Sequence, residues 1–215
     1  KEISQKEGDL LLKASNISEK RKIAAVKMSS MVEGILQKLG MKSTKFCVSI
    51  LPKDGETQWQ KCGQYGIDNI EFLISANLGS PEKPLAKIAS GGELSRVMLA
   101  LKTVLANTDN VETLIFDEID TGIGGEVAIS VGEHLKKLAK NKQILCITHL
   151  ASIAVYADNQ LKIKKSSDEK QTHTSVEYIL GEDRVAEIAR MLSGDTDSSF
   201  SIEHARAMLQ NYGGM

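Results

Sequence analysis

Thr113-Leu-Ile-Phe-Asp-Glu-Ile-Asp120 begins as an apolar run of β-forming residues and turns acidic at Asp117 and Glu118. A second apolar run, residues 143–148, ends directly before His149. Apolar residues recur at helical spacing between the two runs: Val127, Val131, Leu135 and Leu138. The order strand, helix, strand predicts an α/β fold in which two parallel strands are joined by a right-handed crossover.

The ends of these two strands carry the titratable side chains. Parallel strands present their carboxyl ends at one edge of a sheet, which is where open α/β sheets bind ligands. We therefore expect Asp117, Glu118 and His149 to lie near one another. Continuous apolar runs also predict that both faces of each strand are buried. The bland alternative is that the acidic pair is only the solvated exit of a buried strand and that the histidine is structural.

Beside a nucleotide, these three side chains would serve phosphoryl transfer to water. Asp117 is the candidate Mg²⁺ ligand, through water, because this cation prefers oxygen ligands and keeps part of its hydration shell. Glu118 is the candidate catalytic base that orients or deprotonates the attacking water. His149 is the second catalytic candidate, since an imidazole can hydrogen-bond a γ-phosphate or that water. The other histidines are expected to be surface residues: His134, His173 and His204.

Ser90-Gly-Gly-Glu93 opens a long helical pattern. A capping box would explain Ser90 and Glu93, because the hydroxyl and the carboxylate each satisfy an amide at the helix start. Capping does not explain Gly91 and Gly92, which cost backbone entropy in a helix. Two glycines let the backbone approach a bulky anion, and a helix amino end offers free N–H groups to phosphate. We therefore favour an anion-binding helix start over capping alone.

A heptad-like stripe precedes this region. Its apolar members step along residues 16–39 by seven, four, three and four: Ile17, Ala24, Met28, Met31 and Ile35. The pattern predicts either the end of a coiled-coil arm or an amphipathic helix packed on its own domain. Short β-like runs at residues 46–51 and 70–76 follow Gly40. We divide the chain into an arm end, residues 1–40, and a lobe, residues 41–215.

The last part of the chain is expected to contribute packing. Residues 160–164 and 173–180 predict a hairpin around a polar tip at residues 165–171. Two short helices, beginning at Arg184 and at Ser198, are expected to close the chain.

Bulk composition sets the compartment and excludes some partners. The 215 residues are 41% hydrophobic and 26% charged, which is ordinary for a soluble globular protein. A net charge of -1 gives no global attraction to nucleic acid. Three cysteines without a CxxC pair favour the reducing cytoplasm, and no apolar run approaches the roughly 20 residues that span a bilayer. The absence of a starting Met suggests a piece of a longer protein.

The motifs resemble those of the ABC and SMC-type ATPases. Ile88-Ala-Ser-Gly-Gly-Glu-Leu-Ser-Arg96 is similar to their signature loop, and residues 113–120 resemble their Walker B strand. Thr121-Gly-Ile-Gly-Gly125 stands where the D-loop belongs, and Thr148-His149 resembles the switch histidine. Gly124 stands where many relatives carry the D-loop aspartate, so the role of that position is not defined by the motif.

Within that superfamily the chain resembles the RecN family of bacterial double-strand-break repair proteins. The resemblance rests on residues 84–102, 117–123 and 184–194, and it covers essentially the whole chain. It implies the carboxy-terminal lobe of an ATPase head, with a P-loop NTPase-like parallel sheet and flanking helices, preceded by the end of a coiled-coil arm. It also implies a cytoplasmic, nucleoid-associated protein with no membrane partner.

The chain lacks one half of a nucleotide site. No G-x-x-x-x-G-K-[ST] occurs in its 215 residues, so it has no P-loop, and alone it is expected not to hydrolyse ATP. The resemblance implies a P-loop in an amino-terminal head lobe that meets this one through a folded-back coiled coil. Two such heads would form a homodimer around ATP and Mg²⁺, hydrolyse ATP to ADP and phosphate, and act on DNA double-strand-break ends.

The resemblance also distributes the nucleotide contacts. Asp117, Glu118 and His149 would serve the nucleotide of their own head. The signature residues would contact the partner's nucleotide in trans: Ser90, Gly91, Gly92 and Glu93. The D-loop region would add nucleotide contacts from Asp120, Thr121 and Gly122.

Two other functions stay open at this point. A transporter's nucleotide-binding subunit shares the signature, Walker B and switch motifs, although the heptad-like segment argues against it. A non-catalytic module could bind DNA or a protein partner through residues 20–22 or 162–165, which carry short basic runs. Such runs are usually solvated faces, so this is the weaker alternative.

Overall fold

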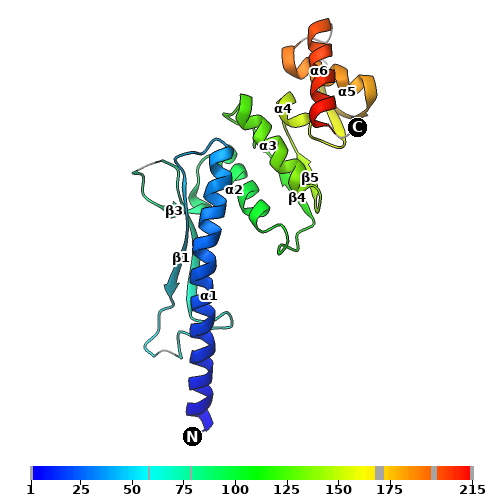
Figure 1. The fold of residues 1–215 in the computed structure, drawn as a ribbon. Helices are drawn as coiled ribbons and strands as arrows, with labels where there is room; N and C mark the ends of the chain where they lie inside the picture. The colour runs from blue at the N-terminus through cyan, green and yellow to red at the C-terminus, as the bar shows by residue number, and fades with distance from the viewer. Residues whose placement is uncertain (1, 58, 78, 168–171, 195–197, 214–215) are drawn as a thin grey trace. The chain divides into compact units, whose positions relative to one another are not determined.

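The computed structural model describes residues 2–57, 59–77, 79–167, 172–194 and 198–213. The chain divides into two compact units, Lys1–Ser90 and Gly91–Met215. Figure 1 shows the first unit from blue to cyan-green and the second from green to red. Among the described residues no helix is long and apolar enough to span a membrane.

The first unit is a long helix with a small antiparallel sheet along it (Figure 1). Helix α1 spans Glu2–Lys38, and the strands are β1 (Lys45–Pro52), β2 (Asp68–Ser75) and the short β3 (Lys83–Pro84). The sheet order is β1-β2-β3, and a 3-10 turn, η1 (Leu85–Lys87), follows. The two strands predicted from the β-like runs are therefore confirmed.

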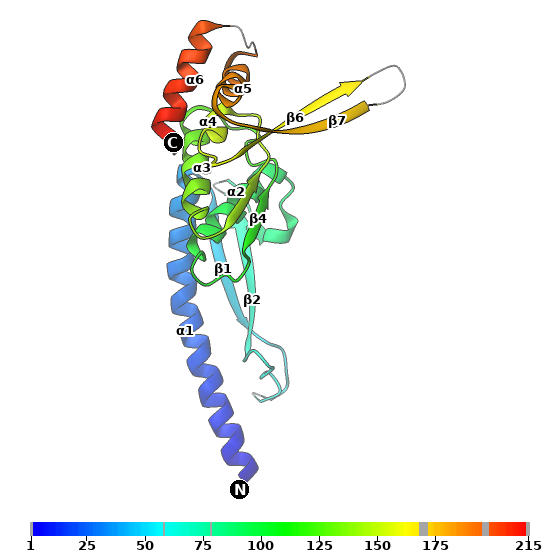
Figure 2. The same cartoon turned by 90° about the vertical axis from the view of Figure 1, so that its right-hand side faces the viewer.

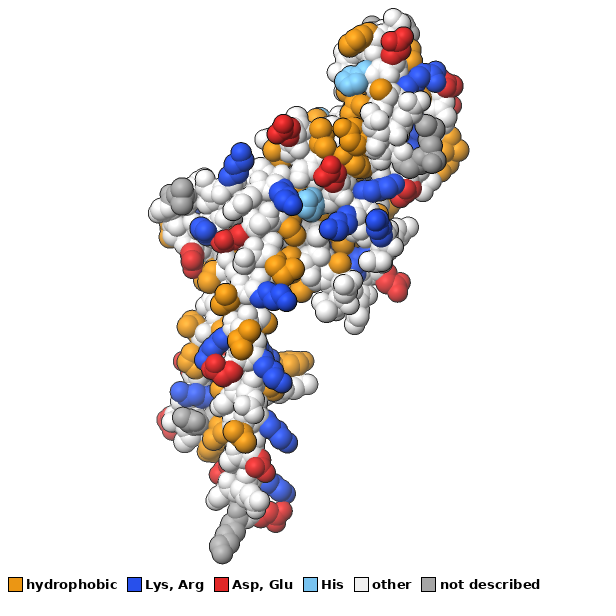
Figure 3. Space-filling view, in the orientation of Figure 1, with side chains coloured by type: hydrophobic (Ala, Val, Ile, Leu, Met, Phe, Trp, Pro, Cys, Tyr) orange, Lys and Arg blue, Asp and Glu red, His pale blue; other side chains and the backbone are white. Residues whose placement is uncertain are grey.

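Helix α1 buries a different face from the predicted heptad stripe. The residues that are buried lie mostly one position further along the helix: Ala14, Ser18, Ala25, Val32 and Leu36. Ile17 and Met31 of the predicted stripe remain exposed. The helix thus packs on its own unit with one face, while apolar side chains elsewhere on it, such as Ile17 and Met31, are exposed in the described part of the chain. Figure 3 shows apolar side chains among charged ones along α1.

The buried carboxylate of Asp68, the first residue of β2, binds side chains of α1. Asp68 accepts hydrogen bonds from Ser18 Oγ at 2.7 Å and from the Arg21 guanidinium at 2.8 Å. Burial alone would raise the pKa of Asp68, but the bonds from Arg21 and Ser18 outweigh it and lower that pKa. The helix therefore has a defined register on the sheet.

The second unit contains the predicted strand, helix, strand segment. Helix α2 spans Gly91–Val104 and is followed by β4 (Thr113–Phe116), α3 (Gly125–Leu138) and β5 (Gln143–Cys146). Strands β4 and β5 are parallel, and Phe116 pairs with Cys146 at their ends. The predicted α/β crossover unit is confirmed.

The expected burial of both faces of these strands is wrong for this chain. Ile115 on β4 is 67% exposed, and Leu145 on β5 and Ile147 just beyond it are 45% and 54% exposed. The apolar runs identified the strands correctly because they encode two buried faces. One of those faces has no cover among the described residues.

The end of the chain forms a hairpin and a helical pair. Strands β6 (Gln160–Ser167) and β7 (Thr172–Ile179) pair in antiparallel fashion, as predicted, and project away from α4 (Ala151–Ala154) in Figure 2. Residues 168–171 of the predicted tip lie outside the described residues. Helices α5 (Gly181–Ser193) and α6 (Ser199–Tyr212) confirm the two expected helices.

A compact core joins these last helices. Its buried members come from α4, α5, α6 and the turn after α4, and they include Val155, Tyr156, Ile188, Ala189, Ala205 and Leu209. Gly132 of α3 lies against this core, because a Cβ atom there would come within 2.3 Å of the Tyr156 ring. The expectation that the final helices serve packing agrees with this arrangement.

Candidate functional site

The parallel pair β4–β5 places the predicted residues at one edge. The backbone N–H of Ile147 donates to the carbonyl of Phe116 at 2.9 Å, so the ladder continues to the last residue before the acidic pair. Asp117 and Glu118 therefore leave β4 beside the segment that leads to His149. The predicted common edge is confirmed, while the catalytic roles stay predictions.

Asp117 has the exposure and chemistry of a water-mediated Mg²⁺ ligand. Its carboxylate is exposed, and its Oδ1 atom accepts the backbone N–H of Glu118 at 2.8 Å. Its carbonyl oxygen accepts the Ser95 hydroxyl at 2.7 Å, which ties α2 to the end of β4. An exposed carboxylate at a strand end fits a hard cation that takes oxygen ligands.

Glu118 adopts a backbone conformation that few residues with side chains adopt. Its φ of 56° makes it the one non-glycine residue with positive φ in the described part of the chain. Such a conformation costs free energy and persists where surrounding contacts enforce it, often at functional sites. The strained backbone is therefore a second reason, besides its place after β4, to regard Glu118 as a candidate catalytic residue.

The glycine pair of the signature region packs against this turn. A Cβ atom on Gly91 would lie 2.0 Å from Glu118 Oε2. A Cβ atom on Gly92 would lie 3.0 Å from both the Glu118 carbonyl oxygen and the Thr121 Cβ. Close approach to backbone within this chain is thus a reason for Gly92, in addition to the predicted approach of an anion, whereas at Gly91 the neighbour is the flexible end of the Glu118 side chain.

Arg96 is a site residue to which sequence reasoning gave no role. It is 7% exposed and donates to the carbonyl oxygens of Ile119 at 3.4 Å and Thr121 at 3.0 Å. Burial lowers the pKa of Arg96, against the opposing charge of Glu93. The available signal was an arginine on the apolar side of a helix, directly before buried Val97.

Asp120 organises the segment at the end of the second strand. The residue is 4% exposed, and its Oδ2 atom accepts Thr148 Oγ1 at 2.6 Å and the His149 backbone N–H at 2.8 Å. The Nδ1 atom of His149 lies 2.9 Å from the same oxygen. The Thr148 hydroxyl in turn accepts the N–H of Leu150 at 3.0 Å. The predicted nucleotide contact of Asp120 stays a prediction.

The predicted D-loop region is a tight turn into α3. The N–H of Thr121 donates to the Glu118 carbonyl at 3.0 Å. Gly122 has a φ of 73°, which favours glycine, whereas Gly124 at the amino cap of α3 is extended. The positive φ of Gly122 explains that glycine, whereas the extended backbone at Gly124 does not require one. The predicted nucleotide contacts of Thr121 and Gly122 stay predictions.

The neighbouring thiol is unsuited to nucleophilic chemistry. Desolvation of Cys146, together with the charges of Asp120 and Asp117, raises the pKa of its thiol to about 12. The reactive form of cysteine is the thiolate, which is scarce at neutral pH when the pKa is this high.

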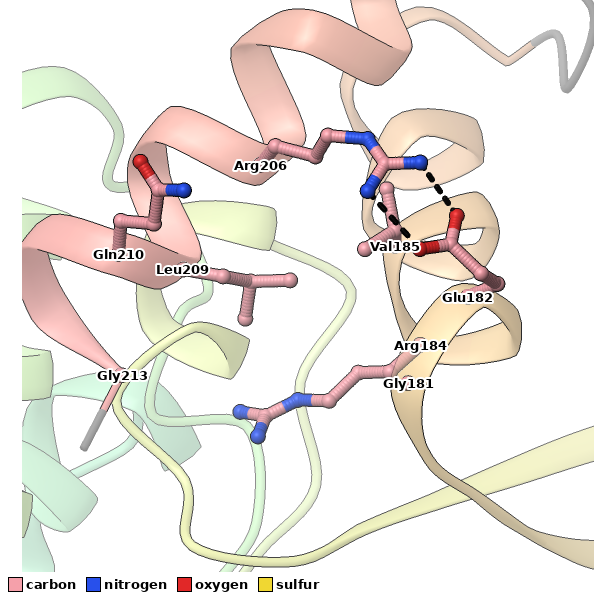
Figure 4. Close-up of a pocket in the computed structure, with 8 residues that line it drawn as sticks. All are labelled: Gly181, Glu182, Arg184, Val185, Arg206, Leu209, Gln210 and Gly213. Carbon is pink, nitrogen blue, oxygen red and sulfur yellow. Dashed lines mark hydrogen bonds and ion pairs between the residues drawn. The ribbon is translucent and has the colours of Figure 1, made fainter. Parts of the chain in front are cut away.

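A pocket of about 270 Å³ lies elsewhere in the second unit, between α5 and α6 (Figure 4). Arg206 at its rim forms an ion pair with Glu182. Arg184 donates to backbone carbonyls, including that of Ala157 at 2.7 Å. The pocket contains none of the predicted site residues, and the two guanidinium groups that line it already have partners.

Comparison with known proteins assigns the family. No family model matches the chain. The DNA repair protein RecN of Treponema pallidum (strain Nichols) is 56% identical over 194 residues, which are 90% of this chain and 34% of that protein. RecN of Bacillus subtilis (strain 168) is 38% identical over 219 residues, covering 98% of this chain and 38% of that one. The chain belongs to the RecN family.

This RecN-family chain spans 34% and 38% of the length of those two relatives. Among solved structures, the Smc head domain with a coiled coil and joint from Pyrococcus yayanosii matches 89% of this chain and 29% of that chain, with a TM-score of 0.48 and 17% identity. The SMC head domain from Thermotoga maritima matches 80% and 52%, with a TM-score of 0.39 and 16% identity. The assignment to RecN rests on the sequence relatives.

Proposed function

We propose that this chain is the carboxy-terminal lobe of an SMC-like ATPase head that works in recombinational repair of DNA double-strand breaks. The observation that carries the proposal is the shared edge of β4 and β5, at which Asp117 and Glu118 follow one strand and His149 follows the other. Family membership supports it, because the relatives named above are DNA repair proteins. Their greater length is consistent with a lobe rather than a whole protein.

Hydrolysis would use the side chains at this edge. Glu118 would accept a proton from, or orient, the water that attacks the γ-phosphate, and His149 would hydrogen-bond that phosphate or the water. Asp117 would hold Mg²⁺ through water, and the ion would neutralise charge on the phosphates. The strained backbone of Glu118 and the buried support of His149 favour a preorganised site.

The other lobe of the same head would complete the sheet. Ile115, Leu145 and Ile147 form an uncovered apolar surface on β4 and β5 and the residue that follows β5. We propose that the amino-terminal head lobe covers it and supplies the P-loop that this sequence lacks. Burial of these side chains would contribute on the order of 1.5–3 kcal/mol each.

The amino end of α2 would act on a second head. Ser90, Gly91, Gly92 and Glu93 would contact the nucleotide held by a partner head, so that ATP joins two heads into a homodimer. Turnover of ATP to ADP and phosphate would release the dimer, and the cycle would control the binding of DNA ends.

The test is a Glu118→Gln variant in a protein that contains both head lobes. We expect at least a 100-fold loss of ATP turnover, because the amide cannot accept a proton, with ATP-dependent dimers retained in light scattering. The control is Glu112→Gln, an exposed glutamate just before β4, which should turn over ATP normally. Normal turnover in Glu118→Gln would overturn the assignment.

The alternative of a DNA- or partner-binding module loses support from the ion pairs. Lys162 pairs with buried Glu187 at 2.5 Å, and Lys164 pairs with Glu177 at 2.9 Å. In the other basic run, Arg21 is engaged by Asp68. These cations are already neutralised within the chain. Membership in the RecN family likewise disfavours a transporter subunit.

A further inference from the structure

The carboxylate of Asp120 is placed to act through another residue. Asp120 is 4% exposed, so it is shielded from solvent. Three groups meet at its Oδ2 atom: Thr148 Oγ1, the His149 N–H and His149 Nδ1, at 2.6, 2.8 and 2.9 Å. The first two are hydrogen bonds to a carboxylate, which are stronger than bonds between neutral groups, and the third is an ion-pair contact. The carboxylate thus holds both the backbone and the ring of His149.

The chemistry of the acceptor determines which ring nitrogen carries hydrogen. A carboxylate only accepts hydrogen bonds, so Nδ1 of His149 must be the donor. A neutral imidazole has a single N–H, which leaves the lone pair of Nε2 as an acceptor at the far end of the ring. The His149 side chain is 74% exposed, and this end of it is therefore accessible to a ligand.

We propose that Asp120 is a positioning residue, which fixes the Nδ1–H tautomer and the orientation of His149. The proposal rests on the proposed function, in which His149 faces the γ-phosphate or the attacking water. With Nδ1 occupied by Asp120, Nε2 can accept a hydrogen bond from that water. Carboxylates that support a functional histidine in this way define its tautomer and orientation in other sites. Thr148 completes the support from the strand side.

The tautomer can be measured without nucleotide in a protein that contains both head lobes. Long-range proton–nitrogen NMR spectra of ¹⁵N-histidine-labelled protein, recorded at about pH 8 where an ordinary imidazole is neutral, distinguish Nδ1–H from Nε2–H. We expect His149 as Nδ1–H, and a shift toward Nε2–H in Asp120→Ala. The matched control is Asp109→Ala, which removes another carboxylate of the same unit that binds Lys102 and the Val111 N–H. It should leave the His149 tautomer unchanged.

Kinetics in a protein with both head lobes tests the consequence for turnover. Asp120→Ala should lower kcat by about 10- to 100-fold with little change in KM for ATP, as loss of a supporting partner does elsewhere. Asp120→Asn keeps an acceptor oxygen and should recover part of kcat. Adding Asp120→Ala to His149→Gln should cost less than Asp120→Ala costs in the wild type, because the part of its effect that passes through the ring is already gone.

Each result supports or overturns the proposal. An Nε2–H tautomer in the wild type, or an unchanged tautomer in Asp120→Ala, overturns it whatever the turnover. Additive losses in the double variant also overturn it, since they indicate a separate structural role. If His149→Gln turns over ATP normally while the tautomer shift is found, the proposed role of His149 fails and the positioning by Asp120 stands.

Discussion

Arg96 donates a hydrogen bond of 3.0 Å to the carbonyl oxygen of Thr121. The bond joins the second turn of α2 to the turn that carries Glu118 and Asp120, and Arg96 itself is 7% exposed. A helix start and a strand end that come from different motifs are thereby held as one piece. The buried guanidinium is a structural requirement of the site.

Arg96→Lys should therefore destabilise the chain. An ammonium group lacks the planar fork of donors that reaches the Ile119 and Thr121 carbonyls, so the buried Ile119 carbonyl and the partly buried Thr121 carbonyl would lose a donor. We expect a loss of about 1–3 kcal/mol in the free energy of unfolding, measured by urea denaturation. Arg206→Lys, at an exposed ion pair with Glu182, should change stability by less than about 1 kcal/mol. Equal effects would contradict the buried role.

Two helix-interior glycines should respond to alanine in opposite directions. Gly34 of α1 has no atom within 4 Å of an added Cβ, so Gly34→Ala should stabilise by about 0.5–1 kcal/mol. Gly132 of α3 would place its Cβ 2.3 Å from the Tyr156 ring, so Gly132→Ala should destabilise. The measurement is the melting temperature of each variant compared with that of the wild type. A shift in the same direction for both variants would refute the described packing.

Asp68 should make the first unit sensitive to acid. Its pKa is lowered from 3.8 in the folded chain, so its ionised form stabilises the fold fully above the unfolded pKa. That stabilisation is lost as pH falls through the lower folded pKa. Asp68→Asn should be less stable than wild type at neutral pH, with the difference shrinking below about pH 4. A gap in urea midpoints that stays constant from pH 7 to about 3 would show that Asp68 contributes no such linkage.

Mixing two inactive proteins should restore turnover if the signature residues act in trans. Ser90→Arg blocks one motif, and Glu118→Gln disables the other. In a protein with both head lobes, the mixture should regain up to about a quarter of wild-type turnover, because about half of the dimers are mixed and each keeps one intact site. If the mixture is as inactive as its parents, the signature residues and Glu118 of one head act in the same site, and the action in trans is contradicted.

The sequence predicted the elements that depend on local patterns. The apolar runs that end at Phe116 and just before His149, with helical spacing between them, were sufficient to predict a parallel pair, because a helical crossover is the usual connection between parallel strands. The glycine pair correctly marked the start of α2. Local pattern was also enough to place the acidic pair and the histidine at one edge.

Contacts between residues far apart in the sequence could not be predicted from local sequence patterns. The exposure of Ile115 depends on which segments cover the sheet. The apolar composition of a strand indicates that its faces should be covered, but it does not indicate by which segment. The choice between Ile17 and Ser18 as the buried position of α1 depends on β1 and β2. Likewise, nothing local to Arg96 or Asp120 reveals which carbonyl or imidazole they meet in space.

Gly92 brings the backbone of α2 directly onto the carbonyl of Glu118, with no side chain between them. In the proposed dimer, that helix start reads the occupancy of one site while Glu118 works in the other. Because backbone packs directly on backbone here, a displacement at one catalytic centre would move the other, with no flexible side chain between them to absorb it. We expect the two centres to hydrolyse ATP cooperatively. In the mixing experiment, turnover above that of the parents but below a quarter of the wild-type value would measure how strongly the two centres are coupled.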